Sequence, residues 1–225
     1  MAFTLQDVSN KINPIPNFPK DGIMFRDITT LLLNNNLFDF AIDEMAKLVQ
    51  KSGLKPDYIA GFESRGFLFN SLATKLNCGF VMIRKPNKLP NSISIEYQKE
   101  YGTDTLTITK SIPEGSNILL VDDLIATGGT VFAGVQLIKL VNCNPIGCIN
   151  LIELIGLDVN PDLLASGLPM LSLLKYRFDE PSIILNKELN QCFTIKNYVP
   201  LVNNHSSKMI EWIVLAIPST LIIVE

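Results

Sequence analysis

Two adjacent carboxylates stand directly before a glycine-rich turn near the middle of the chain. The stretch ILLVDDLIATGGT contains Asp122 and Asp123, followed by Thr127, Gly128, Gly129 and Thr130. Glycines let the backbone curl and aim its N–H groups at one point, threonines add hydroxyl donors, and a following helix adds the positive end of its dipole. This combination predicts a cup for a single phosphate monoester.

The two carboxylates would repel that phosphate, so we expect them to face another part of the ligand. Ionised carboxylates are pure acceptors that suit vicinal sugar hydroxyls, or a magnesium ion held through those hydroxyls and water. The pattern therefore predicts a ribose 5-phosphate, and an acidic turn that merely caps a helix is the alternative. The GxxxxGK[ST] and GxGxxG patterns are absent, which argues against a nucleoside triphosphatase and a hydride-transfer enzyme.

A second group of chemically useful residues lies upstream, in GFESRG and IRKPNK. Its cations are Arg65, Arg84, Lys85 and Lys88. Each could be an ordinary surface charge. Their clustering in a chain of only 18% charged residues favours contact with an anionic ligand.

Alternating strands and helices must position these groups. Buried strands are predicted over residues 58–62, 80–83, 105–109, 117–121 and 146–152. Helices are predicted from Leu37, capped by Asn36, to near Gly53, then through residues 68–76 and over 130–141. The alternation predicts an α/β fold, an open and mostly parallel sheet with helices on both faces. Ligands bind at the carboxyl ends of such strands, where both groups lie.

Composition and charge describe one principal globular domain. The 225 residues are 47% hydrophobic and carry a net charge of −3, which gives no general attraction for nucleic acid. Four cysteines without a CxxC pair, and the single His205, argue against a zinc site and favour a reducing, cytoplasmic location.

The ends of the chain carry two further expectations. The N-terminal residues lack the apolar core of a secretory signal. The apolar stretch 209–225 is interrupted by Glu211 and Pro218, so a packed strand or partner-binding segment is favoured over a membrane anchor, and no membrane association is expected.

Beyond these patterns, VDDLIATGGT resembles the phosphoribosyl pyrophosphate (PRPP) motif of the type I phosphoribosyltransferase family, in the form that acts on adenine. NFPKDGIMFRDITTLL, GFESRGFLFN, IRKPNKLP and EYGTDTLTI resemble the same family in order and spacing. The resemblance implies the type I phosphoribosyltransferase fold over residues 1–178. It also implies a small hood from the N-terminal segment, a flap at about 86–102, and a C-terminal extension, 179–225, of unknown role.

The reaction that this resemblance implies joins N9 of adenine to C1 of PRPP, releasing pyrophosphate and giving AMP for purine salvage. It implies Mg²⁺ on the pyrophosphate and ribose hydroxyls, with no certain direct protein ligand, and a homodimer in which Arg84 reaches the partner's site. Alternatives are a phosphoribosyltransferase for another purine base, or a PRPP-sensing regulator. The acidic net charge and the absence of a winged-helix pattern argue against the regulator.

The same resemblance assigns roles to individual residues. Ribose and 5-phosphate binding falls to Asp122, Asp123, Ala126, Thr127, Gly128, Gly129 and Thr130. Pyrophosphate binding falls to Glu63, Ser64, Arg65, Arg84, Lys85 and Lys88, with a cis peptide between Glu63 and Ser64. Adenine binding falls to Met24, Phe25, Arg26, Glu153 and Leu154, and catalysis to Glu100, Tyr101 and Arg65.

Two positions distinguish this chain within the family. Relatives that act on hypoxanthine and guanine carry an aspartate where this chain has Ala126, so Ala126 implies adenine and moves proton transfer to the flap residue Glu100. Lys99 stands where an apolar residue is usual and adds a cation to the flap.

Overall fold

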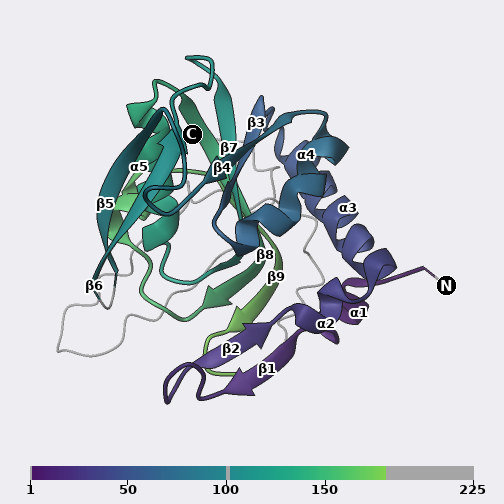
Figure 1. Cartoon of the computed structure of the whole chain (residues 1–225). Coiled ribbons are helices and arrows are strands. Elements are labelled where there is room, and N and C mark those ends of the chain that lie inside the picture. The colour runs from purple at the N-terminus through teal and green to yellow at the C-terminus, as the bar shows by residue number, and fades with distance from the viewer. Residues whose placement is uncertain (1, 100–101, 181–225) are drawn as a thin grey trace, which may run out of the picture.

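The computed structural model describes residues 2–99 and 102–180, and the central sheet lies within them (Figure 1). In this part of the chain, five strands pair in parallel in the order β4-β3-β7-β8-β9. Their bounds are β3 (Tyr58–Phe62), β4 (Gly79–Ile83), β7 (Asn117–Ile125), β8 (Asn144–Ile155) and β9 (Met170–Arg177). The predicted α/β fold with a parallel sheet is confirmed. Most of the predicted C-terminal extension, from residue 181 on, lies outside the described residues.

Helices cover both faces of this sheet (Figure 1). Helices α3 (Asn35–Ser52) and α4 (Asn70–Leu76) lie on one side, and α5 (Gly129–Leu140) lies on the other. Along β7, Leu119 and Val121 enter the core with α3, while Ile118 and Leu120 enter the core with α5. A strand buried on both faces reads as a continuous apolar run, which is why NILLV was recognisable.

Two helix details differ from expectation. The side chain of Asn34, and not Asn36, caps α3 by accepting a hydrogen bond from the Leu37 N–H at 3.2 Å. The pattern expected as one helix over 68–76 is divided into a 3₁₀ helix, η1 (Arg65–Phe69), and α4. The 3₁₀ turn begins close against the sheet, since a Cβ on Gly66 would lie 2.8 Å from the Val121 carbonyl oxygen.

The N-terminal segment forms the predicted hood. Strands β1 (Asn13–Pro16) and β2 (Met24–Asp27) make an antiparallel pair between the short helices α1 (Leu5–Ser9) and α2 (Thr29–Leu32). Neither strand was expected, because the two prolines in NPIP argue against a strand.

A second antiparallel hairpin lies beside α5, at the left of Figure 1. It pairs β5 (Ser92–Lys99) with β6 (Gly102–Thr109), and the short α6 (Pro161–Ala165) follows β8 later in the chain. The segment predicted as a flap, at about 86–102, contains β5, which was not among the predicted strands. Its Ile93, Ile95 and Tyr97 alternate as a strand should and pack on the core around α5.

Candidate active site

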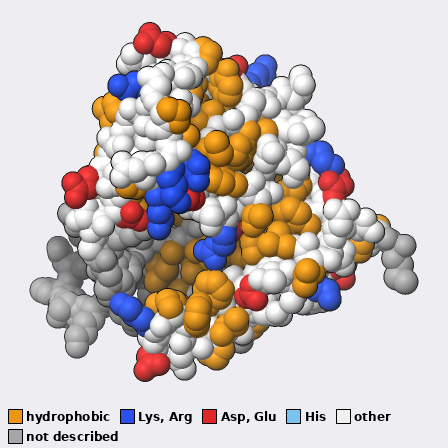
Figure 2. Space-filling model, viewed as in Figure 1, with side chains coloured by type: hydrophobic (Ala, Val, Ile, Leu, Met, Phe, Trp, Pro, Cys, Tyr) orange, Lys and Arg blue, Asp and Glu red, His pale blue; other side chains and the backbone are white. Residues whose placement is uncertain are grey.

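The predicted ligand-binding segments meet at the carboxyl ends of β3, β4 and β7. Residues Glu63 to Gly66 follow β3, the Arg84 to Lys88 segment follows β4, and the acid-glycine stretch spans the end of β7 and the start of α5. Parallel pairing of β4, β3 and β7 brings these three ends to one edge. Figure 2 shows basic side chains gathered near the middle of the face viewed, with apolar surface on either side.

Arg65 connects two of the predicted subsites. Its Nε lies 2.9 Å from Oδ2 of Asp123, and its guanidinium carbon lies 5.6 Å from the centre of the Phe25 ring. The Arg65 side chain is 45% exposed, whereas that of Asp123 is only 3% exposed. Although Arg65 is near, Oδ2 of Asp123 is buried and accepts no well-aligned hydrogen bond from the described residues.

Glu63 stands among the predicted pyrophosphate-binding cations. Its carboxylate accepts from Nζ of Lys88 at 2.8 Å, from the backbone N–H of Lys85 at 2.9 Å and from Nε of Arg84 at 3.2 Å. The Lys88 ammonium, the Lys85 N–H and the Arg84 guanidinium together lower the pKa of Glu63 to about 2. An ionised Glu63 thus holds the two cations in place.

The peptide joining Glu63 to Ser64 is cis, as the family resemblance implied. Ser64 directly precedes η1. The structure therefore brings Glu63, Ser64, Arg65, Arg84, Lys85 and Lys88 to the ends of two neighbouring strands.

The glycine-rich turn leads directly into α5. Gly128, with φ +82°, is the N-cap of α5, and no described side chain caps this end. A Cβ on Gly128 would lie 2.5 Å from Cδ2 of Leu163, and its backbone conformation is one that side-chain-bearing residues rarely adopt. The first N–H groups of α5, beside the hydroxyls of Thr127 and Thr130, are therefore available to an anion.

Burial raises the pKa of both Asp122 and Asp123. Burial raises the pKa of Asp122 well above its ordinary value, and the neighbouring Asp123 charge raises it further. Burial also raises the pKa of Asp123, while the Arg65 cation opposes that rise. A ligand that brings hydroxyl donors or a cation to this pair would stabilise its ionised form.

The hood carries Met24 and Phe25, two of the residues predicted to bind adenine. The Phe25 ring packs edge-on against Phe18, with 5.1 Å between ring centres, and its other neighbour is Arg65. Met24 and Phe25 are half-buried on β2. Phe25 thus stands between the hood and the strand ends.

Arg26 has a different environment from its predicted neighbours. Only 1% exposed, its side chain donates to the backbone carbonyls of Arg177, at 3.0 Å, and of Glu180. Its guanidinium carbon lies 4.4 Å from the centre of the Tyr176 ring. The side chain therefore fastens the hood to the end of β9, which a sequence comparison alone did not indicate.

Glu153 and Leu154 lie near the end of β8. The Glu153 carboxylate forms an ion pair with Lys175 on β9, with 2.8 Å between Oε2 and Nζ. Leu154 packs on the core that contains α3. Their assignment to the base pocket stays a prediction.

The structure describes only part of the predicted flap. Glu100 and Tyr101, the predicted proton carrier and its neighbour, lie outside the described residues, as does the Lys99 side chain. Sequence reasoning missed Tyr97, whose hydroxyl lies 3.3 Å from Oγ1 of Thr130 in the glycine-rich turn. The apolar alternation of Ile93, Ile95 and Tyr97 was the signal that could have found it.

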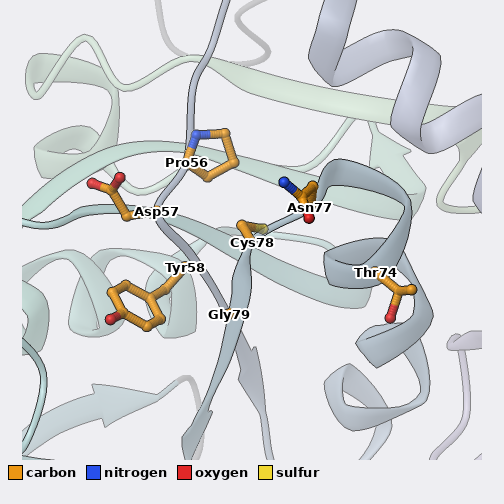
Figure 3. Close-up of a pocket in the computed structure, with 7 residues that line it drawn as sticks. All are labelled: Pro56, Asp57, Tyr58, Thr74, Asn77, Cys78 and Gly79. Carbon is orange, nitrogen blue, oxygen red and sulfur yellow. The ribbon is translucent and has the colours of Figure 1, made fainter.

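A separate surface pocket lies away from these residues. It is lined by Pro56, Asp57, Tyr58, Thr74, Asn77, Cys78 and Gly79, at the amino ends of β3 and β4 (Figure 3). The Asp57 carboxylate there already accepts from the Asn117 N–H at 2.7 Å. The pocket is therefore at the opposite edge of the sheet from the candidate active site.

The described residues contain no group of three His, Cys, Asp or Glu side chains arranged to hold a metal ion. No helix among them is long and apolar enough to cross a membrane.

Comparison with known proteins shows the class of protein to which this chain belongs. Residues 29–162 match the phosphoribosyl transferase domain family, and this range contains the glycine-rich turn, the cation cluster and Glu153.

Individual proteins similar to this chain show to which member family of this class it belongs. An adenine phosphoribosyltransferase of Crocosphaera subtropica is 47% identical over 76% of this chain and 99% of its own length. A crystal structure of the Thermoanaerobacter pseudethanolicus adenine phosphoribosyltransferase is 44% identical, with a TM-score of 0.72, covering 77% of this chain and 100% of its own. The Saccharomyces cerevisiae enzyme, solved with an imino-altritol bisphosphate and adenine, is 38% identical with a TM-score of 0.67, covering 75% and 97%. The chain belongs to the adenine phosphoribosyltransferase family.

Proposed function

We propose that this protein transfers the 5-phosphoribosyl group of PRPP to N9 of adenine, giving AMP and pyrophosphate. The observation that carries the proposal is the position of Arg65 between Asp123, at 2.9 Å, and the Phe25 ring, at 5.6 Å. One cation thereby adjoins a sugar-hydroxyl acceptor and an aromatic surface for a base, next to the Glu63 cluster. The names of the relatives support adenine as that base.

The 5-phosphate belongs in the cup that opens α5. Backbone N–H groups from Gly128 to Thr130, the two threonine hydroxyls and the helix dipole favour a dianion there. Carboxylate oxygens of the Asp122 and Asp123 pair would then accept from the ribose hydroxyls. This fixes the sugar between the cup and Arg65.

The pyrophosphate belongs among Arg65, Arg84 and Lys88. Since the described residues offer no cage for a metal ion, we propose that magnesium arrives as part of the PRPP complex. Magnesium keeps several waters and commonly binds through substrate phosphates and one or two carboxylates, which Asp122 and Asp123 could supply. Bound in this way, it would neutralise charge on the departing pyrophosphate.

The chemical difficulty is electrostatic, because a positively charged, oxocarbenium-like sugar forms as a highly charged leaving group departs. Fixed cations around the leaving group stabilise that charge without reorganising at the moment of reaction. Acceptors from Asp122 and Asp123 lie on the sugar side. Closure of the flap would exclude water and limit hydrolysis of the reactive sugar.

Base selection follows from what stands beside the purine. Phe25 offers a stacking surface, and the Met24 and Phe25 backbone offers polar groups to the base edge. Ala126 provides no acid to handle the ring proton of a 6-oxopurine, so we assign proton transfer at N9 to Glu100, with Tyr101 beside it. These roles, and those of Glu153 and Leu154, rest on the family resemblance.

A direct assay tests the proposed function. Purified full-length protein is incubated with PRPP, Mg²⁺ and labelled adenine, and nucleotide and pyrophosphate are quantified. We expect equal amounts of AMP and pyrophosphate. No AMP above a heat-killed control would reject the proposal, and binding of PRPP without turnover would favour a sensor.

We further propose a cytoplasmic homodimer. Leu68 on η1 and Met82 on the edge strand β4 are 40% and 43% exposed, large apolar side chains that a second copy could cover. Light scattering should give about twice the chain mass of 25.0 kDa. A monomer at micromolar concentration that is fully active would contradict the dimer.

A further inference from the structure

Tyr97 joins the flap hairpin to the glycine-rich turn. Its hydroxyl oxygen lies 3.3 Å from Oγ1 of Thr130, and either atom could be the donor. We propose that Tyr97 is a positioning residue for the 5-phosphate: it orients the Thr130 hydroxyl so that Thr130 donates its proton to the phosphate. The inference rests on the proposed function, because it takes the ligand of the cup to be a phosphate monoester.

The hairpin is well placed to hold Tyr97 there. Ile93, Ile95 and Tyr97 share one face of β5 and pack on the core that contains Val131 and Val135 of α5. At its base the hairpin is tied to the end of β4, where Arg84 and Thr107 exchange two backbone hydrogen bonds of 2.8 Å. The hydroxyl of Tyr97 is therefore presented by a strand that is paired with β6 and packed against α5, and not by a loop.

The chemistry of hydroxyl groups fixes the direction of the bonds once a phosphate is bound. A phosphate dianion has only acceptor oxygens, and a threonine hydroxyl has one proton and two lone pairs. Thr130 must use its proton on the phosphate, so its oxygen can only accept from Tyr97. The result is a relay, Tyr97 O–H to Thr130 O–H to phosphate, in which each bond polarises the next.

The relay predicts an effect on ligand affinity that a mere packing role for Tyr97 would not produce. Removing the Tyr97 hydroxyl leaves Thr130 free to rotate and weakens its bond to the phosphate, but it leaves the base and sugar contacts alone. The loss should therefore be confined to ligands that carry the phosphate. Since the same strand continues toward the flap tip, phosphate binding would also steady the hairpin.

The test compares AMP with adenosine, which share base and sugar and differ in the phosphate. Calorimetric affinities are measured for the full-length wild type and Tyr97→Phe, which keeps the ring. We expect Tyr97→Phe to weaken AMP binding roughly three- to tenfold, the net effect of one hydrogen bond, and to leave adenosine binding unchanged. Tyr58→Phe, at the amino end of β3, is the control and should change neither affinity.

A double-mutant cycle with Thr130→Val completes the test. In the relay, Tyr97 acts on the phosphate through the Thr130 hydroxyl, so Tyr97→Phe should weaken AMP binding little further in the Thr130→Val background. Equal weakening of AMP and adenosine, no weakening of AMP, or a full additional loss in the double variant would each overturn the inference. Failure of the proposed function is distinct: the wild type would form no AMP from adenine and PRPP, whatever Tyr97→Phe does to binding.

Discussion

The two anion-binding ends of the candidate site are built differently. At the ends of β3 and β4, Arg84 and Lys88 are already paired with an internal anion, the Glu63 carboxylate. In the cup before α5, residues 126–130 carry no charged side chain and offer backbone N–H groups and hydroxyls. Cations that Glu63 holds in place suit a leaving group whose negative charge grows as it departs. Fixed, neutral donors suit a 5-phosphate that stays attached to the sugar throughout.

Replacing Arg65, which lies between the two ends of the site, should reduce activity the most. Arg65→Gln removes the cation beside Asp123 and Phe25. We expect kcat/KM for PRPP to fall roughly 100- to 1,000-fold, the usual cost of a preorganised electrostatic contact.

Lys75→Gln is the control for loss of an ion-paired cation. Lys75 pairs with Asp39 and Asp43 on the outer helices, away from the strand ends. Its replacement should change kcat/KM by less than about twofold, as exposed pairs contribute little. Near-normal activity in Arg65→Gln would remove Arg65 from the mechanism.

At the uncharged end of the site, the cup before α5, one added methyl group should disrupt phosphate binding. Gly128→Ala places a Cβ at φ +82° in the cup, and we expect the KM for PRPP to rise at least about tenfold with the KM for adenine unchanged. Gly115→Ala tests the backbone strain alone. Gly115 has φ +77°, and a Cβ there meets nothing within 4 Å. If Gly115→Ala raised the KM for PRPP equally, the cup would not be the cause.

The charged end can be tested through acid stability, where we expect the smallest effect. The pKa of Glu63 is lowered from 4.5 to about 2, so its ionised form stabilises the folded protein above pH 4.5. That stabilisation is lost as pH falls from 4.5 toward 2. Glu63→Gln should remove this part of the pH dependence, on the order of 1 kcal/mol after allowance for solvent screening.

Urea unfolding of wild type and Glu63→Gln at pH 6 and pH 3 measures that difference. Glu44→Gln, which removes the exposed pair with Lys47 on α3, is the matched control. An unchanged gap between the two pH values in Glu63→Gln would show that the Glu63 pairs do not stabilise the fold.

The strands whose two faces are both buried could be predicted from their apolar runs. Residues 58–62 were predicted with the bounds that β3 has, whereas β7 extends four residues beyond the predicted Val121. Two carboxylates usually mark the end of a strand, yet parallel pairing with β8 continues through Ile125. Strand β1 was missed for its prolines, and β5 because its alternating residues lie in a polar segment that also contains prolines.

The sequence shows which candidate site residues are neighbours in the chain, but not which of them meet across the fold. The glycine-rich turn predicts a phosphate-binding cup from the sequence alone, because the sequence places hydrogen-bond donors next to the start of a helix. The approach of Arg65 to Phe25 joins segments 40 positions apart in the sequence, and no spacing rule predicts it. The internal pairing of Glu63 with Lys88 likewise depends on the parallel register of β3 and β4.

Base selectivity tests the central claim most directly. Initial rates of nucleotide formation are measured for the wild-type protein with PRPP and Mg²⁺ at matched concentrations of adenine, hypoxanthine and guanine. Because we propose that Ala126 occupies the position where 6-oxopurine enzymes carry an acid, we predict AMP formation with a kcat/KM at least about 100-fold above either 6-oxopurine. Equal or faster formation of the hypoxanthine or guanine nucleotide would contradict the account.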